Sequence, residues 1–501
     1  MNLLLLGIET VFAPTVLLWI ILGVVLGVVF GALPGVSATM AIVLCISFTY
    51  GMDPVVAIAF LSAVYCAAIT GGSITAILFK IPGTPSSAAT VLDGYPMVQR
   101  GEAGKALTIA LVSSGIGGLA SAIIMFLLTQ PLMRLALKFS SSEQFAVCFL
   151  GLSILIFLDE KRKLNTFASA IVGLWLGTIG IDWFSSVPRF TFGSSKMLDG
   201  IEALPFMLGL FAAVEIFDQI RNPDDRSAFS HEKQAKVTKL SSFKELWALK
   251  WTALRSGILG TVVGIMPGAG ATIASWLAYT LEAKFSSHPE LLGKGDPHGI
   301  CASETANNAA TGGAMVPLLA MGIPGSNAAA MMMTALAIHG VQMGPLLLKA
   351  QPAYLSATFA SMVLANIAMI FISFGIAKIF AQILKIPYHI LGTFIMVLAL
   401  VGCYAYQGNM MDIYIMIFGG IFGYFFKKYK FNTSALILAL VLGPMLEKNF
   451  RRGMEIADNN LMAFFGRPIT LVVMGIFVVM YAFAIYTSIK SSKNKKSAAK
   501  A

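Results

Sequence analysis

The sequence predicts an all-α polytopic membrane protein with about a dozen transmembrane or half-spanning helices, in two inverted repeats whose helices are broken by Pro-Gly pairs. Composition is one reason: 57% of the 501 residues are hydrophobic and 12% are charged, which is roughly half the charged fraction of a soluble domain. Apolar runs of about 20 residues, long enough to cross a hydrocarbon core, recur along the whole chain. Three short landmarks also recur in both halves. Long runs such as residues 16–33 argue against a β-barrel, whose segments are short and alternating.

The first repeat is expected over residues 1–220. Its apolar runs are residues 16–33, 40–48, 54–78, 106–128, 145–158, 167–181 and 201–217. The third run contains Thr70-Gly71-Gly72, where we expect the helix to break. Residues 90–105 are too polar to face lipid, and Asp93-Gly94-Tyr95-Pro96 predicts a turn there. Ser113, Gly115, Gly117 and Gly118 give the fourth run a face of small residues suited to close helix packing.

Residues 221–250 form the one long hydrophilic segment, in which basic residues outnumber acidic ones. We expect a cytoplasmic linker that ends in a short interfacial helix, because Ser242 and Glu245 have the spacing of a capping box. The second repeat is expected over residues 251–450, with its later runs at residues 354–374, 390–401, 413–426 and 435–446. Residues 451–489 are read as an added transmembrane helix, centred on residues 469–486, and residues 490–501 as a Lys-rich cytoplasmic tail.

Three landmarks indicate an internal duplication. Pro34-Gly35 aligns with Pro267-Gly268 at a shift of 233 residues (267 − 34). The Gly-Gly pairs beginning at Gly71 and Gly312 align at 241 (312 − 71), and the Ile-Pro-Gly turns beginning at residues 81 and 323 align at 242 (323 − 81). One Pro-Gly pair is a weak signal, whereas three landmarks in order at nearly constant shift predict a repeat.

The distribution of charge predicts the topology. The net charge of +11 lies mainly in short loops and the tail, which is typical of membrane orientation rather than of nucleic-acid binding. A cytoplasmic linker and tail give each repeat an odd number of crossings, so the repeats are inverted, as in many secondary transporters. This scheme places the basic cluster at residues 448–452 on the outer side of the membrane. The N-terminus lacks the basic region of a signal peptide, and we expect no cleavage.

The broken segments predict a substrate site. Irregular backbone persists at membrane depth only inside protein or beside a watery cavity. Pro-Gly pairs begin at Pro34, Pro82, Pro267 and Pro324. Free N–H groups at helix starts attract anions, and nearby hydroxyl and amide groups add donors without a charge. The candidate substrate-binding residues are Ser37, Thr39, Gly83, Thr84, Ser86, Ser87, Gly268, Thr272, Asn307, Asn308, Thr311, Gly325, Ser326 and Asn327.

Other interpretations stay open at this point. Any single glycine or proline can equally be a packing or kink residue. Glu304 is either an interfacial carboxylate at the start of a span or a coupling or gating residue. The five cysteines are expected to be small buried thiols, and no spacing resembles a metal site. Metalloprotease, nucleophile-elbow and phosphate-loop motifs are missing from the sequence, so we predict no enzyme activity and no cofactor, only a coupling ion, Na⁺ or H⁺.

The motifs also carry a resemblance to a known family. They are Leu33-Pro34-Gly35, Lys80-Ile81-Pro82-Gly83-Thr84-Pro85, Asp93-Gly94-Tyr95-Pro96, Met266-Pro267-Gly268-Ala269-Gly270, Glu304-Thr305-Ala306-Asn307-Asn308-Ala309 and Gly322-Ile323-Pro324-Gly325. Together they resemble the large membrane subunit of tripartite tricarboxylate transporters, the TctA family. The resemblance implies a bacterial inner-membrane permease for citrate-like carboxylates, driven by an ion gradient. It also implies two partners, a small membrane subunit and a periplasmic solute-binding protein. The alternative is a stand-alone ion-coupled organic anion transporter, and a channel is a further one.

Overall fold

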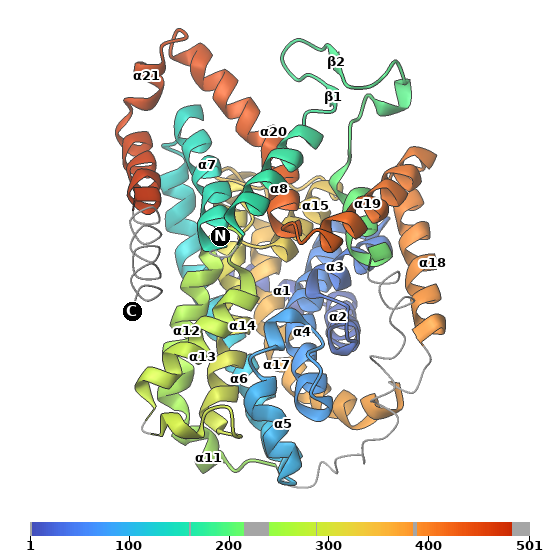
Figure 1. Ribbon diagram of the computed structural model, residues 1–501, viewed down its shortest axis with the longest axis vertical. Coiled ribbons are helices and arrows are strands. Elements are labelled where there is room, and N and C mark those ends of the chain that lie inside the picture. Colours follow the sequence, from blue (N-terminus) through green and yellow to red (C-terminus); the bar gives the residue numbers. More distant parts are fainter. Residues whose placement is uncertain (1–2, 160–161, 215–239, 287, 384–387, 483–501) are drawn as a thin grey trace, which may run out of the picture. The chain divides into compact units, whose positions relative to one another are not determined.

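The computed structural model describes residues 3–159, 162–214, 240–286, 288–383 and 388–482 (Figure 1). The predicted Lys-rich tail and most of the predicted linker lie outside these residues. The chain divides into two compact units: unit 1 is Met1–Ala136 with Glu202–Phe425, and unit 2 is Leu137–Ile201 with Phe426–Ala501. Both units draw on both halves of the sequence. Compact units and sequence repeats are different divisions of the chain, so the repeat boundaries stay predictions.

The described chain is mostly helical. Six of its helices are long and apolar enough to cross a membrane: Pro14–Ala32, Pro54–Phe79, Ala103–Ala136, Pro352–Ile379, Met410–Lys428 and Thr433–Ile456. Shorter apolar helices are Ala38–Thr49, Ser141–Phe157, Asn327–Ile338, Gly392–Gln407 and Pro468–Ala482. The all-α class is therefore confirmed, while the dozen spans and the inverted relation of the repeats stay predictions.

Unit 1 is built around two helix pairs, α2 with α4 and α12 with α14. Helix α6 packs against α14, and α17 packs against both α4 and α6. The helices before the linker are α1 (Leu3–Val11), α2 (Pro14–Ala32), α3 (Ala38–Ile46), α4 (Pro54–Phe79), α5 (Val91–Gln99), α6 (Ala103–Ala136) and α9 (Ala203–Leu208). Those after it are α11 (Phe243–Ala248), α12 (Lys250–Ile265), α13 (Gly270–Phe285), α14 (Pro297–Met321), α15 (Asn327–Ile338), α16 (Leu347–Ala350), α17 (Pro352–Ile383), α18 (Tyr388–Gln407) and α19 (Met410–Lys428). Short 3-10 turns at Ser47–Thr49, Pro85–Ser87 and Pro289–Leu291 and a π-helical turn at Gly209–Ala213 complete it.

The helix pairs α2–α4 and α12–α14 make equivalent close contacts at matching glycines. A Cβ added at Gly31 would lie 1.9 Å from the carbonyl oxygen of Ala68, and one at Gly264 would lie 2.5 Å from that of Ala310. The shift is 233 residues on the first helix (264 − 31) and 242 on the second (310 − 68). Three further contacts of the first half have a counterpart in the second half at the same shifts. The contact of Gly27 with Val64 matches that of Gly260 with Ala306. The contacts of Gly71 with Val28 and of Gly83 with Gly31 match those of Gly313 with Thr261 and of Gly325 with Gly264. The packing places Gly71 with Gly313, so the sequence alignment of the Gly-Gly pairs is wrong by one residue.

The predicted break at Thr70-Gly71-Gly72 is wrong, because α4 runs through it without interruption. Helix α14 likewise continues through Gly312, Gly313 and Pro317. The glycines serve close packing: a Cβ at Gly71 would lie 2.4 Å from a backbone oxygen of α2. The helices end later, at Lys80 (φ 60) and Gly322 (φ 74), which adopt the left-handed conformation. The interruptions are therefore the Pro-Gly turns alone.

Residues 93–96 do not form the predicted turn but lie inside α5, with Pro96 within the helix. The reason is a tertiary contact that turn propensity cannot reveal. The carboxylate of Asp93 accepts hydrogen bonds from the backbone N–H groups of Gly295 and Asp296, both at 2.8 Å, and from the Tyr279 hydroxyl at 2.7 Å. These bonds tie α5 to the segment before α14.

Two local predictions are confirmed. Helix α11 begins with the capping box of Ser242 and Glu245. The small-residue face of α6 allows close packing, because a Cβ at Gly117 would lie 2.1 Å from the carbonyl oxygen of Thr305 on α14.

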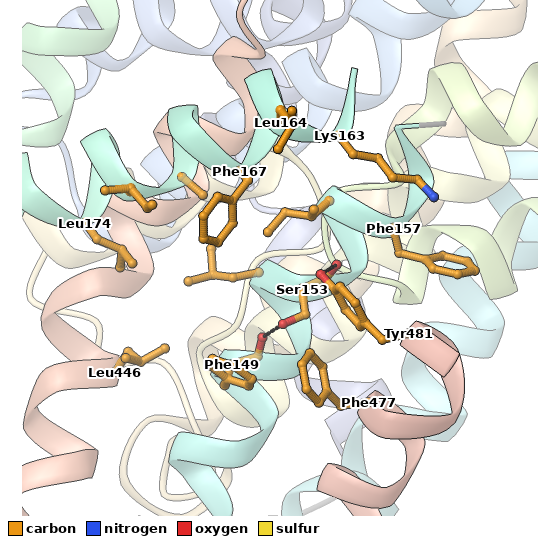
Figure 2. Close-up of a pocket in the computed structure, with 14 residues that line it drawn as sticks. Phe149, Ser153, Phe157, Lys163, Leu164, Phe167, Leu174, Leu446, Phe477 and Tyr481 are labelled. Atoms are coloured by element: carbon orange, nitrogen blue, oxygen red, sulfur yellow. Dashed lines mark hydrogen bonds between the residues drawn. The ribbon is translucent and has the colours of Figure 1, made fainter. Parts of the chain in front are cut away.

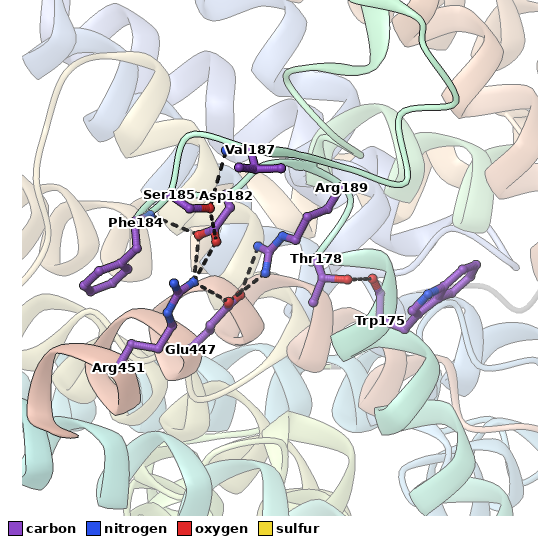
Figure 3. Close-up of polar contacts among 9 residues, drawn as sticks. All are labelled: Trp175, Thr178, Asp182, Phe184, Ser185, Val187, Arg189, Glu447 and Arg451. Carbon is purple, nitrogen blue, oxygen red and sulfur yellow. Dashed lines mark hydrogen bonds and ion pairs between the residues drawn. The ribbon is translucent and has the colours of Figure 1, made fainter. Parts of the chain in front are cut away.

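Unit 2 contains α7 (Ser141–Leu158), α8 (Lys163–Leu176), a hairpin of β1 (Gly180–Ile181) and β2 (Pro188–Arg189), a 3-10 turn (Ser195–Met197), α20 (Thr433–Ile456) and α21 (Leu461–Phe465). The run 167–181 is thus not one helix: α8 ends at Leu176, and a hairpin follows. Figure 3 shows how charged residues hold this hairpin to α20. Arg451 contacts Asp182 at 2.7 Å, and Arg189 contacts Glu447 at 2.7 Å.

Candidate functional site

The candidate site lies in unit 1, where side chains of α4 meet those of the second half. Asn308 on α14 is fully buried, and its Nδ2 lies 2.9 Å from the Thr70 hydroxyl and 3.3 Å from the backbone oxygen of Cys66. One turn earlier on α4, the Tyr65 hydroxyl lies 3.2 Å from the hydroxyl of Ser326. We call these two contacts, Thr70–Asn308 and Tyr65–Ser326, the α4 polar pairs. They bring uncharged donors from both halves of the sequence together inside an apolar helix bundle.

The turn that follows α4 adds a cluster of three hydroxyls. Thr84 lies 2.9 Å from Ser86 and 3.1 Å from Ser87, measured between side-chain oxygens, and all three residues are buried. A Cβ at Gly72 would lie 2.3 Å from the Thr84 hydroxyl and 2.5 Å from that of Ser87. The second glycine of the pair therefore makes room for this cluster on the side of α4. The sequence names all three as candidate substrate-binding residues, which stays a prediction, and it gives Gly72 no role in placing them.

The turn that follows α14 joins the two Pro-Gly pairs of the second half. The N–H of Gly268 donates to the carbonyl oxygen of Gly325 at 3.0 Å. Ser326 then caps α15 by accepting from the N–H of Ala329 at 3.1 Å. Ser326 thus serves both the helix start and the contact with Tyr65. Asn327, the next residue, is half-buried at the first position of α15.

The turns of each half lie against helices of the other half. Helix α3 packs against α15, and α13 packs against the turn Pro85–Ser87. Ser37 caps α3 by accepting from the N–H of Met40. Within the described residues, Thr39 and Thr272 make no side-chain hydrogen bond. The Thr311 hydroxyl donates to Asn308 O on its own helix and also contacts the Cys66 thiol on α4. The predicted residues are therefore split among capping, turn and pairing roles.

Glu304 lies near this region but inside α14, two turns after the helix begins. Its side chain is fully buried inside the protein, and its position relative to the membrane interface stays a prediction. Its oxygens accept hydrogen bonds from the Thr90 hydroxyl, from the Ser114 hydroxyl at 2.8 Å and from Asn307 Nδ2 at 3.2 Å. The coupling or gating role stays a prediction.

Sequence reasoning missed several polar residues that the structure places here. The residues predicted from the sequence do not include Tyr65, Thr70, Thr90 or Ser114, although each of them contacts a predicted residue. Thr70 served only as a landmark for a break, and Ser114 lay on a face assigned to packing. An isolated hydroxyl in a long apolar run was the available signal, but its partner is hundreds of residues away.

Two cavities elsewhere have a different chemistry. One, of about 580 Å³ in unit 2, is lined by aliphatic and aromatic side chains with Lys163 at one side (Figure 2). Such a lining suits hydrocarbon rather than a tricarboxylate. The other, of about 630 Å³ in unit 1, lies at the start of α14 and mixes cations with acids. Lys105 there pairs with Glu245 at 2.8 Å, so part of its positive charge is already neutralised.

The described residues contain no group of three or more histidine, cysteine, aspartate or glutamate side chains that could hold a metal ion. All five cysteines are free and buried, as predicted.

Comparison with known proteins decides the family. The sequence profile of the tripartite tricarboxylate transporter TctA family matches residues 17–438. The chain belongs to this family.

The relatives of this TctA-family chain include two proteins of Agrobacterium vitis. An uncharacterized 52.8 kDa protein in the TAR-I ttuC′ 3′ region is 34% identical over 490 residues, covering 98% of this chain and 97% of the relative. An uncharacterized protein in the TAR-II ttuC′ 3′ region is 33% identical over 236 residues, covering 47% of this chain and 98% of the relative. No solved structure matches. With its apolar helices, membership makes this TctA-family chain a multi-pass membrane protein and a transport permease.

Proposed function

We propose that this chain is the large permease subunit of a secondary active transporter that takes up small organic carboxylates, with citrate-like tricarboxylates as the substrate class. Uptake is driven by an ion gradient across the bacterial inner membrane. A periplasmic solute-binding protein delivers the substrate, and a small membrane subunit completes the transporter. The linker and the C-terminus face the cytoplasm, as the basic residues of both segments favour.

The α4 polar pairs are the observation that carries this proposal. Buried hydroxyl and amide groups at the centre of an apolar bundle are costly unless they find partners. Here they pair across the two halves of the sequence, beside helices that end in Pro-Gly turns. A carboxylate can take over these donors one by one, and the N–H groups at the start of α15 add a favourable dipole. Lining of this kind binds an anion without a permanent positive charge that would hold it too tightly.

Uptake in vesicles tests the proposal. The chain and its small membrane subunit are reconstituted in proteoliposomes with labelled citrate and the purified binding protein. A sodium gradient and a proton gradient are applied separately. We expect citrate to accumulate against its gradient under one of the two ions, and only when the binding protein is present.

Two results would count against the proposal. If neither gradient drives uptake of citrate, tartrate or succinate, the assignment to carboxylate uptake is wrong. If uptake is equally fast without the binding protein, the stand-alone alternative replaces the tripartite arrangement. Leak of citrate at equal rates in both directions, independent of either gradient, would indicate a channel.

A further inference from the structure

Glu304 is a buried acid whose polar partners are all neutral. Thr90, Ser114 and Asn307 supply two hydroxyls and one amide N–H group to its two oxygens. The amide oxygen of Asn307, Oδ1, is buried and has no hydrogen-bond partner among the described residues. A carboxylate at this depth is therefore solvated only by neutral dipoles. Such a group is stable only if it takes up a proton or is accompanied by a cation.

Several titratable groups lie on the elements around Glu304, and some of them are paired with other groups. On α4, α5, α6, α12, α13 and α14 they are Tyr65, Cys66, Asp93, Tyr95, Arg100, Lys105, Arg134, Lys250, Arg255, Tyr279, Glu282, Lys284, His298 and Cys301. Arg255 and His298 contact Glu282, at 2.9 Å and 3.4 Å. Lys105 contacts Glu245. Within the described part of the chain, no lysine, arginine or histidine forms an ion pair with Glu304.

The groups around Glu304 fit a proton better than a metal ion. A sodium ion needs several oxygen atoms turned toward it, but here the two hydroxyls and the amide N–H point their hydrogens at the carboxylate. Only Asn307 Oδ1 is unengaged. A protonated carboxyl instead finds ready acceptors. It can donate to Thr90, whose hydroxyl lies 3.0 Å from that of Ser303, and Ser303 donates to the backbone oxygen of Gly299 at 2.9 Å.

Asn307 offers a second acceptor for the same proton. Its Nδ2 lies 3.2 Å from Glu304 Oε2, and rotation of the amide by half a turn exchanges Nδ2 for the unpartnered Oδ1. Asn307 Nδ2 can then donate a hydrogen bond to the charged carboxylate, and Asn307 Oδ1 can accept one from the neutral acid. Asn307 can therefore offer a hydrogen-bonding group to either protonation state of Glu304 without moving a helix.

Glu304 lies near a polar cavity at the start of α14. Glu304 follows Pro297 by seven residues (304 − 297), which is about 10 Å along a helix. Pro297 and His298 line the polar cavity of about 630 Å³ at the start of α14, next to α11. The Thr90–Ser303 hydroxyl chain is buried and ends at the backbone oxygen of Gly299, the residue that follows His298 of the cavity lining.

We propose that Glu304 is the proton-coupling site of this permease: its carboxyl binds one proton on the side where substrate enters and releases that proton to water on the other side. This deepens the proposed function and rests on it, because coupling has meaning only if the chain carries a carboxylate. The coupling ion is then H⁺, and a sodium-driven transporter is the outcome that would overturn the proposal.

The test uses Glu304→Gln, which keeps the size of the side chain and fixes it as neutral. Glu290→Gln is the matched control, since Glu290 is exposed and lies outside this region. Both are reconstituted like the wild type and checked for normal membrane abundance. We expect Glu304→Gln to lose at least about tenfold in proton-driven citrate accumulation. Equilibrium exchange of labelled citrate, which moves no net proton, should stay near the wild-type rate, and the control should match the wild type in both assays.

An infrared difference spectrum between acid and alkaline pH provides a readout independent of transport. The wild type should show a carboxylic-acid C=O band that Glu304→Gln lacks and Glu290→Gln keeps.

The coupling proposal is overturned if Glu304→Gln still accumulates citrate under a proton gradient, or if the band is unchanged in it. It is also overturned if wild-type uptake follows a sodium gradient alone. If the wild type carries no carboxylate while the band behaves as expected, the proposed function has failed and the protonation of Glu304 has not.

Discussion

At the scale of single residues, the candidate site depends on neutral side chains that satisfy one another. Each hydrogen bond of the α4 polar pairs contributes about 1 kcal/mol net, whereas leaving one of these buried groups without a partner costs roughly 1–3 kcal/mol. Asn308 and Thr70 therefore hold each other while no substrate is bound. A substrate carboxylate that separates Asn308 from Thr70 must accept a hydrogen bond from each of them. The two oxygens of one carboxylate can do this. Recognition of this kind is selective for shape as well as charge.

A second residue-scale feature is the charge pair that anchors the hairpin of unit 2 (Figure 3). Hydrogen bonds from Arg451 and from the backbone N–H of Phe184 hold the pKa of Asp182 well below its ordinary value of 3.8. Since the folded-state pKa is lowered, the contribution of this pair to stability is complete above 3.8 and is lost as the pH falls below that value. We expect hydrogen exchange at the hairpin amides, corrected for intrinsic rates, to be slow at about pH 6 and faster at about pH 3.

The variant Asp182→Asn provides the control for the hairpin. Without the carboxylate, the hairpin amides should exchange faster at both pH values, and the acid-induced change should shrink. If the wild type exchanges equally at both pH values, Asp182 does not anchor the hairpin.

At the scale of helices, glycine sets the distance between α12 and α14. A Cβ at Gly264 would lie 2.5 Å from the backbone oxygen of Ala310, whereas one at Gly257 on the same helix meets only a Thr305 methyl group at 3.6 Å. We expect Gly264→Ala to destabilise the protein by about 1–3 kcal/mol, because backbone cannot give way cheaply. Gly257→Ala should be neutral or stabilise by up to about 1 kcal/mol, because alanine favours helix.

Thermal unfolding in detergent, with both variants beside the wild type, measures this difference. Equal melting temperatures for Gly264→Ala and Gly257→Ala would show that the close contact between α12 and α14 does not limit stability.

The helices also show how far the sequence could lead. Pro-Gly turns were predictable because proline and glycine each disfavour continued helix, and the turns after α4 and α14 lie where expected. The continuity of the helices at Gly71 and Gly312 was not predictable. A glycine inside a helix can either interrupt the helix or let a neighbouring helix approach, and which of the two occurs depends on the neighbouring helix. The same limit hid Tyr65 and Thr90, whose partners are 261 and 214 residues away. The sequence thus predicts turns and caps from neighbouring residues, whereas contacts between distant residues become visible only in the folded structure.

At the scale of the molecule, the repeated glycine contacts support a duplicated pair of helices inside unit 1. Each helix pair ends in a Pro-Gly turn, and each half places its turn against a helix of the other half. This exchange brings Ser326 to Tyr65 and Asn308 to Thr70. Two matched elements that meet around one polar centre fit alternating access, in which one half moves against the other around a fixed site.

The most direct test of the account is citrate uptake in proteoliposomes by Asn308→Ala and Asn327→Ala. Asn409→Ala is the matched control, since within the described part of the chain the Asn409 side chain accepts one hydrogen bond, from the N–H of Met411 at the start of α19. We expect both site variants to abolish uptake at near-normal membrane abundance, while Asn409→Ala transports like the wild type. If Asn308→Ala and Asn327→Ala both transport at the wild-type rate, the substrate does not bind at the α4 polar pairs or the start of α15.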